Sequence, residues 1–462
     1  MKKNIYNLVY DALCILIATF IYIPFVSIHT IFTIAIFNIS LIFIFLLINF
    51  YKSTFIQKIF YKLKIILLAT SVLSVLKILF FGFKIYSEII FLQDILLFIL
   101  IILPRIFLNI REFKINFIKN YNISRQGTLV IGGLGYIGSE LTLELLKNNQ
   151  KVSILDCAMF GDKVIKKFST FPNFNFIKGY ASDVILLSKL LRENSKVVHL
   201  AGLVGDPACS LDEKDTIYFN IKTTNIIKEL CIEYEIRRLI FASSCSVYGS
   251  TDELCHENTP TKPVSLYAKT KVDSENELLE SSIDTKILRF STIFGPSERL
   301  RFDLVVNLFI AQAYYDKKIT VFGGNQERPF LHVKDASKSI LNFLNHKITG
   351  TQDLYNIGCD ELNGTINQVA ELIKKNIPDS NISLSLENVD ARNYAVSFKK
   401  YNNLFPNQKF TTIESAIKEF IDIFEKTEIK FKENLYSNLL TTKSFINDKK
   451  SQIKIINNFL YE

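Results

Sequence analysis

Tyr267 and Lys271, four residues apart in the stretch YAKTK, are the residues of this chain best suited to proton transfer. On a helix, positions i and i+4 share one face, so the two side chains would lie together. A tyrosine hydroxyl is a weak base at neutral pH because its reference pKa is about 10. A neighbouring ammonium and a bound nicotinamide cation would stabilise the phenolate and bring its pKa into a working range. Taken alone, this spacing is common and is more often a surface tyrosine and lysine.

A glycine cluster, Gly132-Gly133-Leu134-Gly135-Tyr136-Ile137-Gly138, offers a second kind of chemistry. Glycine lets the backbone turn tightly and approach a pyrophosphate, which the N-terminus of a following helix then stabilises. Asp156 ends the next apolar run, eighteen residues after Gly138. A carboxylate there accepts hydrogen bonds from both ribose hydroxyls and repels a 2′-phosphate, so the pattern predicts NAD rather than NADP as the cofactor.

A hydroxyl-rich stretch, Ala242-Ser243-Ser244-Cys245-Ser246-Val247-Tyr248-Gly249, also follows an apolar run. One of its hydroxyls could hold the oxygen atom that Tyr267 deprotonates, although a serine cluster more often caps a turn or a helix. The three motifs occur in order along one series of elements, and that order favours a single site.

These motifs need a regular framework, and the chain from residue 127 onward supplies one. Short apolar runs predict strands, and amphipathic stretches between them predict helices. The alternation is typical of an α/β fold with a Rossmann-type, doubly wound parallel sheet, in which ligands bind at the carboxyl ends of the strands. The predicted strands are 128–132, 151–156, 174–178, 196–201, 237–243 and 286–290, and the predicted helices are 139–149, 183–193, 212–235 and 264–281.

The order of the motifs resembles the extended short-chain dehydrogenase/reductase family, and within it the NAD-dependent epimerases and dehydratases of nucleotide sugars. The resemblance covers residues 127–425 and rests on GGLGYIG, Asp156, HLAG at 199–202, SSCSVYG, YAKTK and RPFLHVKD at 328–335. It implies that Tyr267 is the catalytic base and acid. It also implies that Lys271 lowers the pKa of Tyr267 and holds the nicotinamide ribose, and that Ser244 binds the reacting hydroxyl.

The same resemblance implies a set of binding residues and a homodimer formed through the helices at 212–235 and 264–281. For the cofactor the residues are Gly132, Gly135, Tyr136, Ile137, Gly138, Asp156, Asp183, Leu200, Ala201, Asn220, Tyr267 and Lys271. For the nucleotide-sugar substrate they are Ser244, Thr292, Asn307, Arg328 and Arg392. The planar donors of an arginine suit phosphate oxygens, so the two arginines would hold the diphosphate.

Two positions depart from the family pattern. The sugar 4,6-dehydratases carry Asp-Glu or Asp-Lys after the catalytic hydroxyl residue, where this chain has Cys245 and Ser246. Removing water across C5 and C6 needs an acid to protonate the departing hydroxyl, so these residues favour epimerisation, or simple oxidation and reduction. Thr292 stands where a substrate-contacting Asn is expected, which leaves the identity of the sugar open.

The predicted function is an NAD-dependent nucleotide-sugar epimerase that oxidises and reduces the sugar at C4, in surface polysaccharide biosynthesis. A 4-keto reductase, a dehydrogenase or a dehydratase is an alternative activity. A membrane-bound regulator that binds NAD or a sugar nucleotide without catalysis is a second alternative. Such proteins typically lose the Tyr or the Lys, and both are present here.

The first quarter of the chain has a different composition. No Asp, Glu, Lys or Arg occurs from Ala12 to Tyr51, a stretch about twice the ~20 apolar residues that a membrane-spanning helix needs. We expect four spans, at about 8–27, 31–50, 65–83 and 86–108, the last one weaker because Glu88 and Asp94 interrupt it. A buried helical bundle and a cleaved signal peptide are the alternatives.

Lys and Arg lie before the first span, after the second and after the fourth, and the turn between the first two spans has none. The positive-inside rule then places both termini and the catalytic region in the cytoplasm, at a bacterial inner membrane. The expected domains are 1–110 (transmembrane helices), 111–126 (linker), 127–289 (NAD-binding), 290–427 (substrate-binding) and 428–462 (a C-terminal tail that forms a surface helix or a mobile end).

The formal net charge of +9 does not by itself indicate nucleic acid binding. The basic residues are scattered and form no arginine-rich stripe with interleaved aromatic residues, so no nucleic acid partner is expected. The seven cysteines show no CxxC pair and no metal-ligand spacing. They predict free thiols in a reducing compartment and no metal site.

Overall fold

The computed structural model describes residues 125–347, 351–387 and 390–447, which belong to one compact unit of the chain. The four predicted membrane spans, and all but the end of the predicted linker, lie outside these ranges. Within them, no helix combines the length and the apolar character that crossing a bilayer requires.

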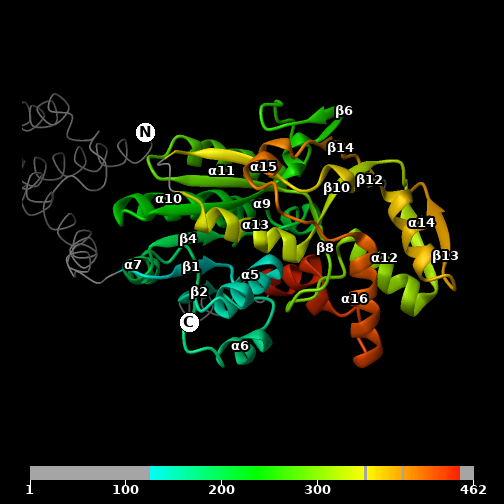
Figure 1. The fold of residues 1–462 in the computed structure, drawn as a ribbon, viewed down its shortest axis with the longest axis horizontal. Helices are drawn as coiled ribbons and strands as arrows, with labels where there is room; N and C mark the ends of the chain where they lie inside the picture. The colour runs from blue at the N-terminus through cyan, green and yellow to red at the C-terminus, as the bar shows by residue number, and fades with distance from the viewer. Residues whose placement is uncertain (1–124, 348–350, 388–389, 448–462) are drawn as a thin grey trace, which may run out of the picture. The chain divides into compact units, whose positions relative to one another are not determined.

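Seven parallel strands form the central sheet, as the alternation of elements predicts (Figure 1). The strand order β11-β7-β5-β4-β1-β2-β3 reverses direction between β1 and β4, which is the doubly wound arrangement. Every residue of β1 is buried. A parallel strand that is covered on both faces appears in the sequence as a nearly continuous apolar run, as β1 does. The strands are β1 (Thr128–Ile131), β2 (Val152–Asp156), β3 (Phe174–Lys178), β4 (Lys196–His199), β5 (Arg238–Ser244), β7 (Thr285–Phe290) and β11 (Asp353–Ile357).

The helices around this sheet pack in two groups (Figure 1). The first group is α5 (Tyr136–Lys147), α6 (Lys163–Phe168) and α13 (Val333–Asn345). The second is α7 (Val184–Glu193), α10 (Thr223–Glu233) and α11 (Leu266–Leu279). The apolar faces of α5 and α13 meet the sheet in a continuous core, in which Leu141, Ile340 and Phe343 have no exposed surface.

The helix predicted over 212–235 is divided in the structure. It consists of α9 (Glu213–Ile217), a π-helical turn (Tyr218–Lys222) and α10. A π-helical turn inserts an extra residue into the helix, which re-aims the side chains that follow it. Here the turn carries Asn220, whose amide is buried against the loop after β4.

After residue 290 the chain adds strands to smaller sheets, contributes β11 to the central sheet, and then adds further strands to the smaller sheets. Strand β11 pairs with β7 at the edge of the central sheet, so residue 290 does not divide the chain into two successive layers. The smaller sheets contain β8 (Thr292–Phe294), β10 (Glu327–His332) and β12 (Asn363–Thr365); β9 (Lys318–Phe322) and β13 (Asn381–Ser385); and β6 (Ser250–Cys255) and β14 (Asn393–Val396). The remaining helices are α8 (Asp206–Cys209), α12 (Val305–Ala311), α14 (Ile366–Asn376), α15 (Lys399–Leu404) and α16 (Ile413–Lys426).

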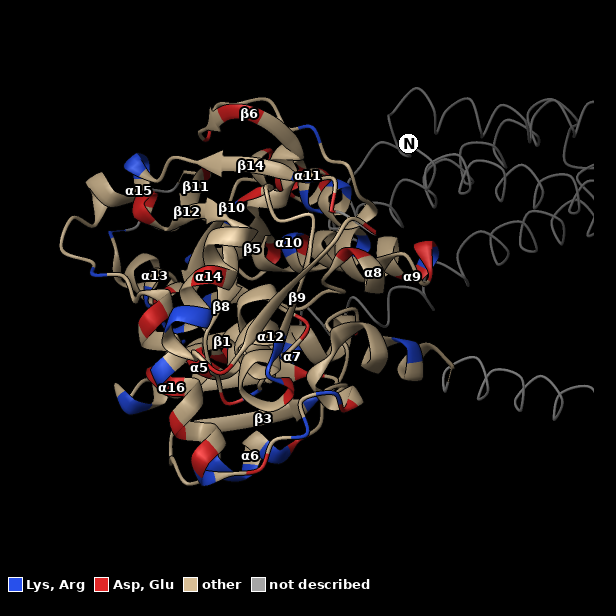
Figure 2. Ribbon diagram, turned by 90° about the vertical axis from the view of Figure 1, so that its right-hand side faces the viewer, with Lys and Arg blue, Asp and Glu red and all other residues tan. Residues whose placement is uncertain are grey.

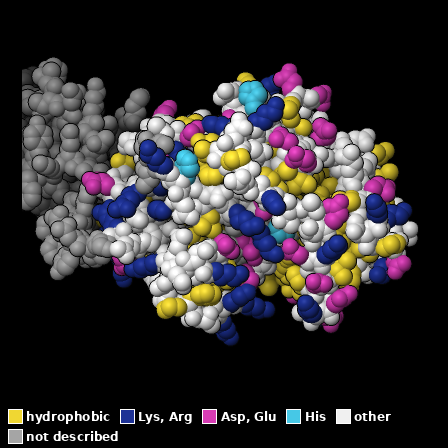
Figure 3. All heavy atoms as spheres, viewed as in Figure 1, with side chains coloured by type: hydrophobic (Ala, Val, Ile, Leu, Met, Phe, Trp, Pro, Cys, Tyr) yellow, Lys and Arg dark blue, Asp and Glu magenta, His cyan; other side chains and the backbone are white. Residues whose placement is uncertain are grey.

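Charged side chains of both signs are interspersed over the described elements. Figure 2 shows basic and acidic residues together on α6 and α16. The face drawn in Figure 3 likewise mixes the two signs, with apolar side chains between them. Neither view shows a continuous basic stripe over the described elements.

Candidate active site

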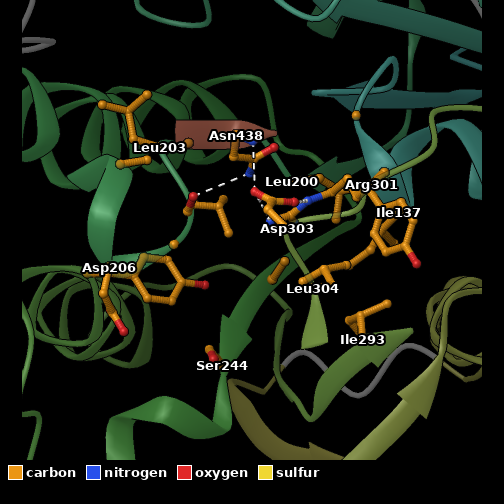
Figure 4. Close-up of a pocket in the computed structure, with 18 of the residues that line it drawn as sticks. Ile137, Leu200, Leu203, Asp206, Ser244, Ile293, Arg301, Asp303, Leu304 and Asn438 are labelled. Carbon is orange, nitrogen blue, oxygen red and sulfur yellow. Dashed lines mark hydrogen bonds and ion pairs between the residues drawn. The ribbon is translucent and has the colours of Figure 1, made fainter. Parts of the chain in front are cut away.

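A cavity of about 710 Å³ opens at the carboxyl ends of β1, β2, β4 and β5, where the doubly wound sheet predicts a ligand. Its volume lies within the range of about 300–1,000 Å³ that ligand sites occupy. In Figure 4, Ser244 and Asp206 lie on one side of it, and Arg301 and Asn438 on the other. The predicted residues that line the cavity are Gly132, Gly135, Tyr136, Ile137, Gly138, Asp156, Leu200, Ala201, Ser244, Tyr267, Lys271, Thr292, Arg328 and Arg392.

The glycine-rich turn between β1 and α5 has the geometry that a bound diphosphate requires. Gly132 has a φ of +87°, and a Cβ there would lie 2.7 Å from the backbone nitrogen of Ala201. A Cβ at Gly138 would lie 2.2 Å from the Gly132 carbonyl oxygen, so only glycine lets the helix approach the turn this closely. Gly135 begins α5 and makes no side-chain cap. The first N–H groups of α5 can therefore bind phosphate oxygens.

At the end of β2, two backbone N–H groups hold the Asp156 carboxylate. The N–H of Leu134 donates to Oδ2 at 3.0 Å, and the N–H of Ala158 donates to Oδ1 at 2.8 Å. Burial raises the pKa of this carboxyl, and the two hydrogen bonds act in the opposite direction. The fixed carboxylate lines the cavity beside the glycine-rich turn, which is the position expected for contact with the ribose of a dinucleotide.

Ser244, Tyr267 and Lys271 come together at the carboxyl end of β5. Ser244 ends this strand, and α11 presents Tyr267 and Lys271 on one face, as their spacing predicts. The Ser244 hydroxyl lies near Tyr267 and lowers the pKa of the Tyr267 hydroxyl. Lys271 Nζ donates to the carbonyl oxygen of Ala242 at 2.7 Å and lies 5.8 Å from the centre of the Tyr267 ring. The three residues form one cluster that opens into the cavity.

The protein alone does not turn Tyr267 into a base. Burial raises the pKa of its hydroxyl, and although the nearby Ser244 hydroxyl and Arg301 lower it, burial has the larger effect. Burial also lowers the pKa of Lys271 to about 8, so its ammonium still predominates at neutral pH. Deprotonation of Tyr267 therefore needs a further positive charge beside it, which an oxidised nicotinamide ring would provide.

The two predicted phosphate-binding arginines meet carboxylates in the same cavity. Arg392 Nη1 lies 2.8 Å from Asp206 Oδ2, and Arg392 also pairs with Asp390. Arg328 Nη2 lies 3.0 Å from Asp390 Oδ2. Asp206 follows β4 and Arg392 precedes β14, so these ion pairs connect the central sheet to the smaller ones. A diphosphate that binds the arginines must compete with these carboxylates.

Three predicted binding residues do not line the cavity, and each of them holds the fold instead. Asp183 accepts hydrogen bonds from two backbone N–H groups at the start of α7. Asn220 bonds both the N–H and the carbonyl oxygen of Leu203. Asn307 accepts a hydrogen bond from the N–H of Gly295 at 2.8 Å. Each of these side chains thus makes hydrogen bonds to the backbone that position a segment near the cavity.

The C-terminal segment takes part in the site, whereas the sequence predicts a surface tail there. The N–H of Phe302 donates to the Tyr436 carbonyl at 3.0 Å. The N–H of Asn438 donates to Asp303 Oδ2 at 2.8 Å, and this contact is drawn in Figure 4. Residues 438–447 are helical. Four residues of the segment line the cavity: Ser437, Asn438, Leu439 and Phe445.

Within the ranges that the structure describes, no group of three His, Cys, Asp or Glu side chains could hold a metal ion. The six cysteines of these ranges are free thiols.

Residues 128–358 match the family described as "NAD dependent epimerase/dehydratase family". The chain is 34% identical over 226 residues to "Uncharacterized UDP-glucose epimerase YtcB" of Bacillus subtilis, covering 46% of this chain and 70% of that protein. It is 28% identical over 255 residues to the UDP-glucose 4-epimerase of Lactobacillus helveticus, covering 50% of this chain and 76% of that one.

Among solved structures, the fold is similar to that of UDP-glucuronic acid 4-epimerase from Bacillus cereus in complex with UDP-glucuronic acid and NAD. The TM-score is 0.58 at 26% identity, over 65% of this chain and 99% of that one. The glycine-rich turn and Asp156 fit NAD, the cofactor that the family description names. The sheet, the cavity and the matched residues together show that the chain belongs to the NAD dependent epimerase/dehydratase family.

Proposed function

We propose that this protein is a nucleotide-sugar 4-epimerase. The observation that carries the proposal is that Ser244, Tyr267 and the buried Lys271 line one cavity together with the glycine-rich turn. Two arginines suited to a diphosphate, Arg328 and Arg392, line the same cavity. A sugar held by its diphosphate can thus present a hydroxyl to Tyr267.

NAD, when bound, supplies the group that takes a hydride from the sugar and returns it. The Tyr267 hydroxyl takes the proton of the sugar hydroxyl during oxidation and gives it back during reduction. Ser244 donates a hydrogen bond that holds the reacting oxygen against Tyr267, and the Lys271 ammonium stabilises the phenolate. For epimerisation, the oxidised sugar must turn within the cavity so that its other face is reduced.

The residues next to Ser244 favour epimerisation over dehydration. Cys245 is fully buried, its thiol donates to the carbonyl oxygen of Arg289, and burial raises its pKa. Ser246 lines the cavity but is no acid at neutral pH. The Asp206 carboxylate is held by Arg392 and by the Ser265 hydroxyl. Both oxygens of this carboxylate are therefore engaged by other side chains, and it is not placed as a free acid beside a departing hydroxyl.

We also propose that the N-terminal apolar segments attach the enzyme to a membrane with the catalytic region in the cytoplasm, where it serves surface polysaccharide synthesis. The support is the uncharged stretch from Ala12 to Tyr51 and the basic residues beyond it. On this proposal, the full chain sediments with membranes, detergent releases it, and alkaline carbonate does not. The homodimer stays a prediction.

The test of the activity is a panel of UDP-, GDP- and dTDP-sugars incubated with the full chain in detergent and catalytic NAD. Proton NMR identifies the products, and absorbance at 340 nm reports net NADH. A C4 epimer without net NADH supports the proposal. Net NADH with a keto product indicates a dehydrogenase, and NAD binding without turnover of any sugar indicates a non-catalytic protein.

A further inference from the structure

Arg299 is a buried cation that neither the sequence motifs nor the catalytic cluster explains. Its residue is 6% exposed, and it lines the cavity from the loop before α12. The guanidinium stacks on Phe160, with its central carbon 3.8 Å from the ring centre. Its Nε and Nη2 are buried and have no hydrogen-bond partner within the described residues.

A guanidinium in this state is unfavourable without an anion. Burial lowers the pKa of Arg299 to about 9, and the neighbouring Arg301 acts in the same direction. The nearest carboxylates are engaged elsewhere. Asp303 is bound by Arg301 at 2.9 Å, and Asp156 accepts its two backbone hydrogen bonds. The loop therefore presents a cation that has no anionic partner among the residues that the structure describes.

The position of Arg299 indicates which anion completes it. Phe160, on which the guanidinium stacks, follows β2. Asp156 and Tyr136 both raise the pKa of Arg299 by their nearby charge. The guanidinium therefore lies at the dinucleotide end of the cavity. The uncapped N-terminus of α5 faces the same space. Arg328 and Arg392, by contrast, pair with Asp390.

We propose that Arg299 binds the diphosphate of NAD from the side opposite the glycine-rich turn. The diphosphate would then lie between the N–H groups of α5 and the guanidinium, whose planar donors fit phosphate oxygens. The contact also supplies the negative charge that the buried cation lacks.

The C-terminal segment keeps Arg299 in this position. Two hydrogen bonds fasten the loop that carries Arg299: the N–H of Phe302 donates to the Tyr436 carbonyl oxygen, and the N–H of Asn438 donates to the Asp303 carboxylate. A donor fixed before the ligand arrives loses little freedom on binding. Arg299 is thus a preorganised ligand of the cofactor.

The experiment compares the full-length wild type with Arg299→Met, Arg299→Lys and Arg237→Met, the last a control at an exposed arginine. Calorimetry measures the affinities for NAD, ADP-ribose, adenosine and UDP, and thermal unfolding measures the stability without ligand. We expect Arg299→Met to weaken NAD and ADP-ribose by roughly 10- to 100-fold. Adenosine and UDP should change less than about twofold, and the melting temperature without ligand should not fall. Arg299→Lys should lose less affinity for NAD and ADP-ribose than Arg299→Met does. Arg237→Met should bind both ligands as the wild type does.

Three results would overturn the proposal: unchanged NAD affinity, equal losses for adenosine and NAD, or a loss confined to UDP. A lower melting temperature without ligand, together with unchanged NAD affinity, would show a structural role instead. The inference rests on NAD as the cofactor and not on epimerisation. If the wild type binds NAD and turns over no sugar, the epimerase proposal fails while the Arg299 prediction still stands on its own data.

Discussion

The buried Lys271 ammonium should destabilise the folded protein at neutral pH. Its pKa falls from the ordinary 10.5 to about 8, chiefly by burial, which corresponds to about 3 kcal/mol against the charged form. The unfolded chain keeps this proton up to its higher pKa, whereas the folded chain releases it above pH 8. Between these values the unfolded state binds more protons, so stability rises with pH.

Lys271→Met removes the titrating group and should abolish this part of the pH dependence. About 2 kcal/mol of the effect is recovered between pH 7 and pH 9.5, or about 3 °C in melting temperature for a unit of this size. From pH 7 to pH 9.5, the melting temperature of the wild type should therefore rise by about 3 °C relative to that of Lys271→Met. Lys271→Met also removes the hydrogen bond to the Ala242 carbonyl oxygen. The free energy of unfolding that this costs is the same at every pH, so it does not affect the comparison.

The assay is thermal unfolding of the ligand-free full chain at several pH values. Lys269→Met is the matched control, because Lys269 lies on the same helix, α11, and is exposed. The control should follow the wild type. If Lys271→Met and Lys269→Met gave the same pH dependence, the ammonium would not be buried beside Tyr267, and the electrostatic description of the site would be wrong.

Three further predictions concern the cavity. Tyr267→Phe should lower turnover by at least about 100-fold and leave NAD affinity nearly unchanged, because it removes the proton-transferring hydroxyl and keeps the ring in the cavity wall; steady-state kinetics and calorimetry would check both, and equal losses in both would refute a catalytic role. Asp156→Ser should raise the affinity for NADP relative to NAD by about tenfold or more, since it removes the charge that repels a 2′-phosphate; an unchanged ratio measured by calorimetry would contradict this. Phe445→Ala should speed NAD release, because Phe445 lines the cavity from the C-terminal segment; stopped-flow displacement would measure it, and an unchanged release rate would show that the segment does not retain the cofactor.

The central sheet was predictable because its strands are short apolar runs between amphipathic helices. All six predicted strands are strands of the sheet, with bounds that differ by no more than a few residues. The seventh, β11, comes after β8, β9 and β10 of the smaller sheets, and its neighbour in the sheet, β7, is not its neighbour in sequence. Local patterns do not report such long-range pairing.

The site could be predicted where its chemistry requires particular residues at a fixed spacing along the sequence. The glycine-rich turn, Asp156, Ser244 and the pair on α11 follow from local geometry, and the structure brings them to one cavity. Asn220, by contrast, was carried over by resemblance, and the buried amide bonds Leu203. A polar residue that supports a loop cannot be told from one that touches a ligand until its partners are known.

Arg299 and the C-terminal segment could not be predicted from sequence pattern. An arginine after a Gly-Pro turn is usually solvated. Arg299 differs because it is buried against Phe160, and its Nε and Nη2 have no hydrogen-bond partner in the described part of the chain. Within residues 428–447, the buried apolar residues Ile429, Phe431 and Ile446 follow neither a helical nor a strand period. Their place over the cavity follows from tertiary contacts.

The most direct measurement of the central proposal is the fate of a deuterium label at C4 of the sugar. The nucleotide sugar that turns over is prepared with deuterium at C4 and incubated with the full chain and a trace of NAD. An epimerase that oxidises and reduces C4 within one closed site returns the label to C4 of the epimer, without exchange into NADH or water. Deuterium found at another carbon, in free NADH or in solvent would contradict the assignment.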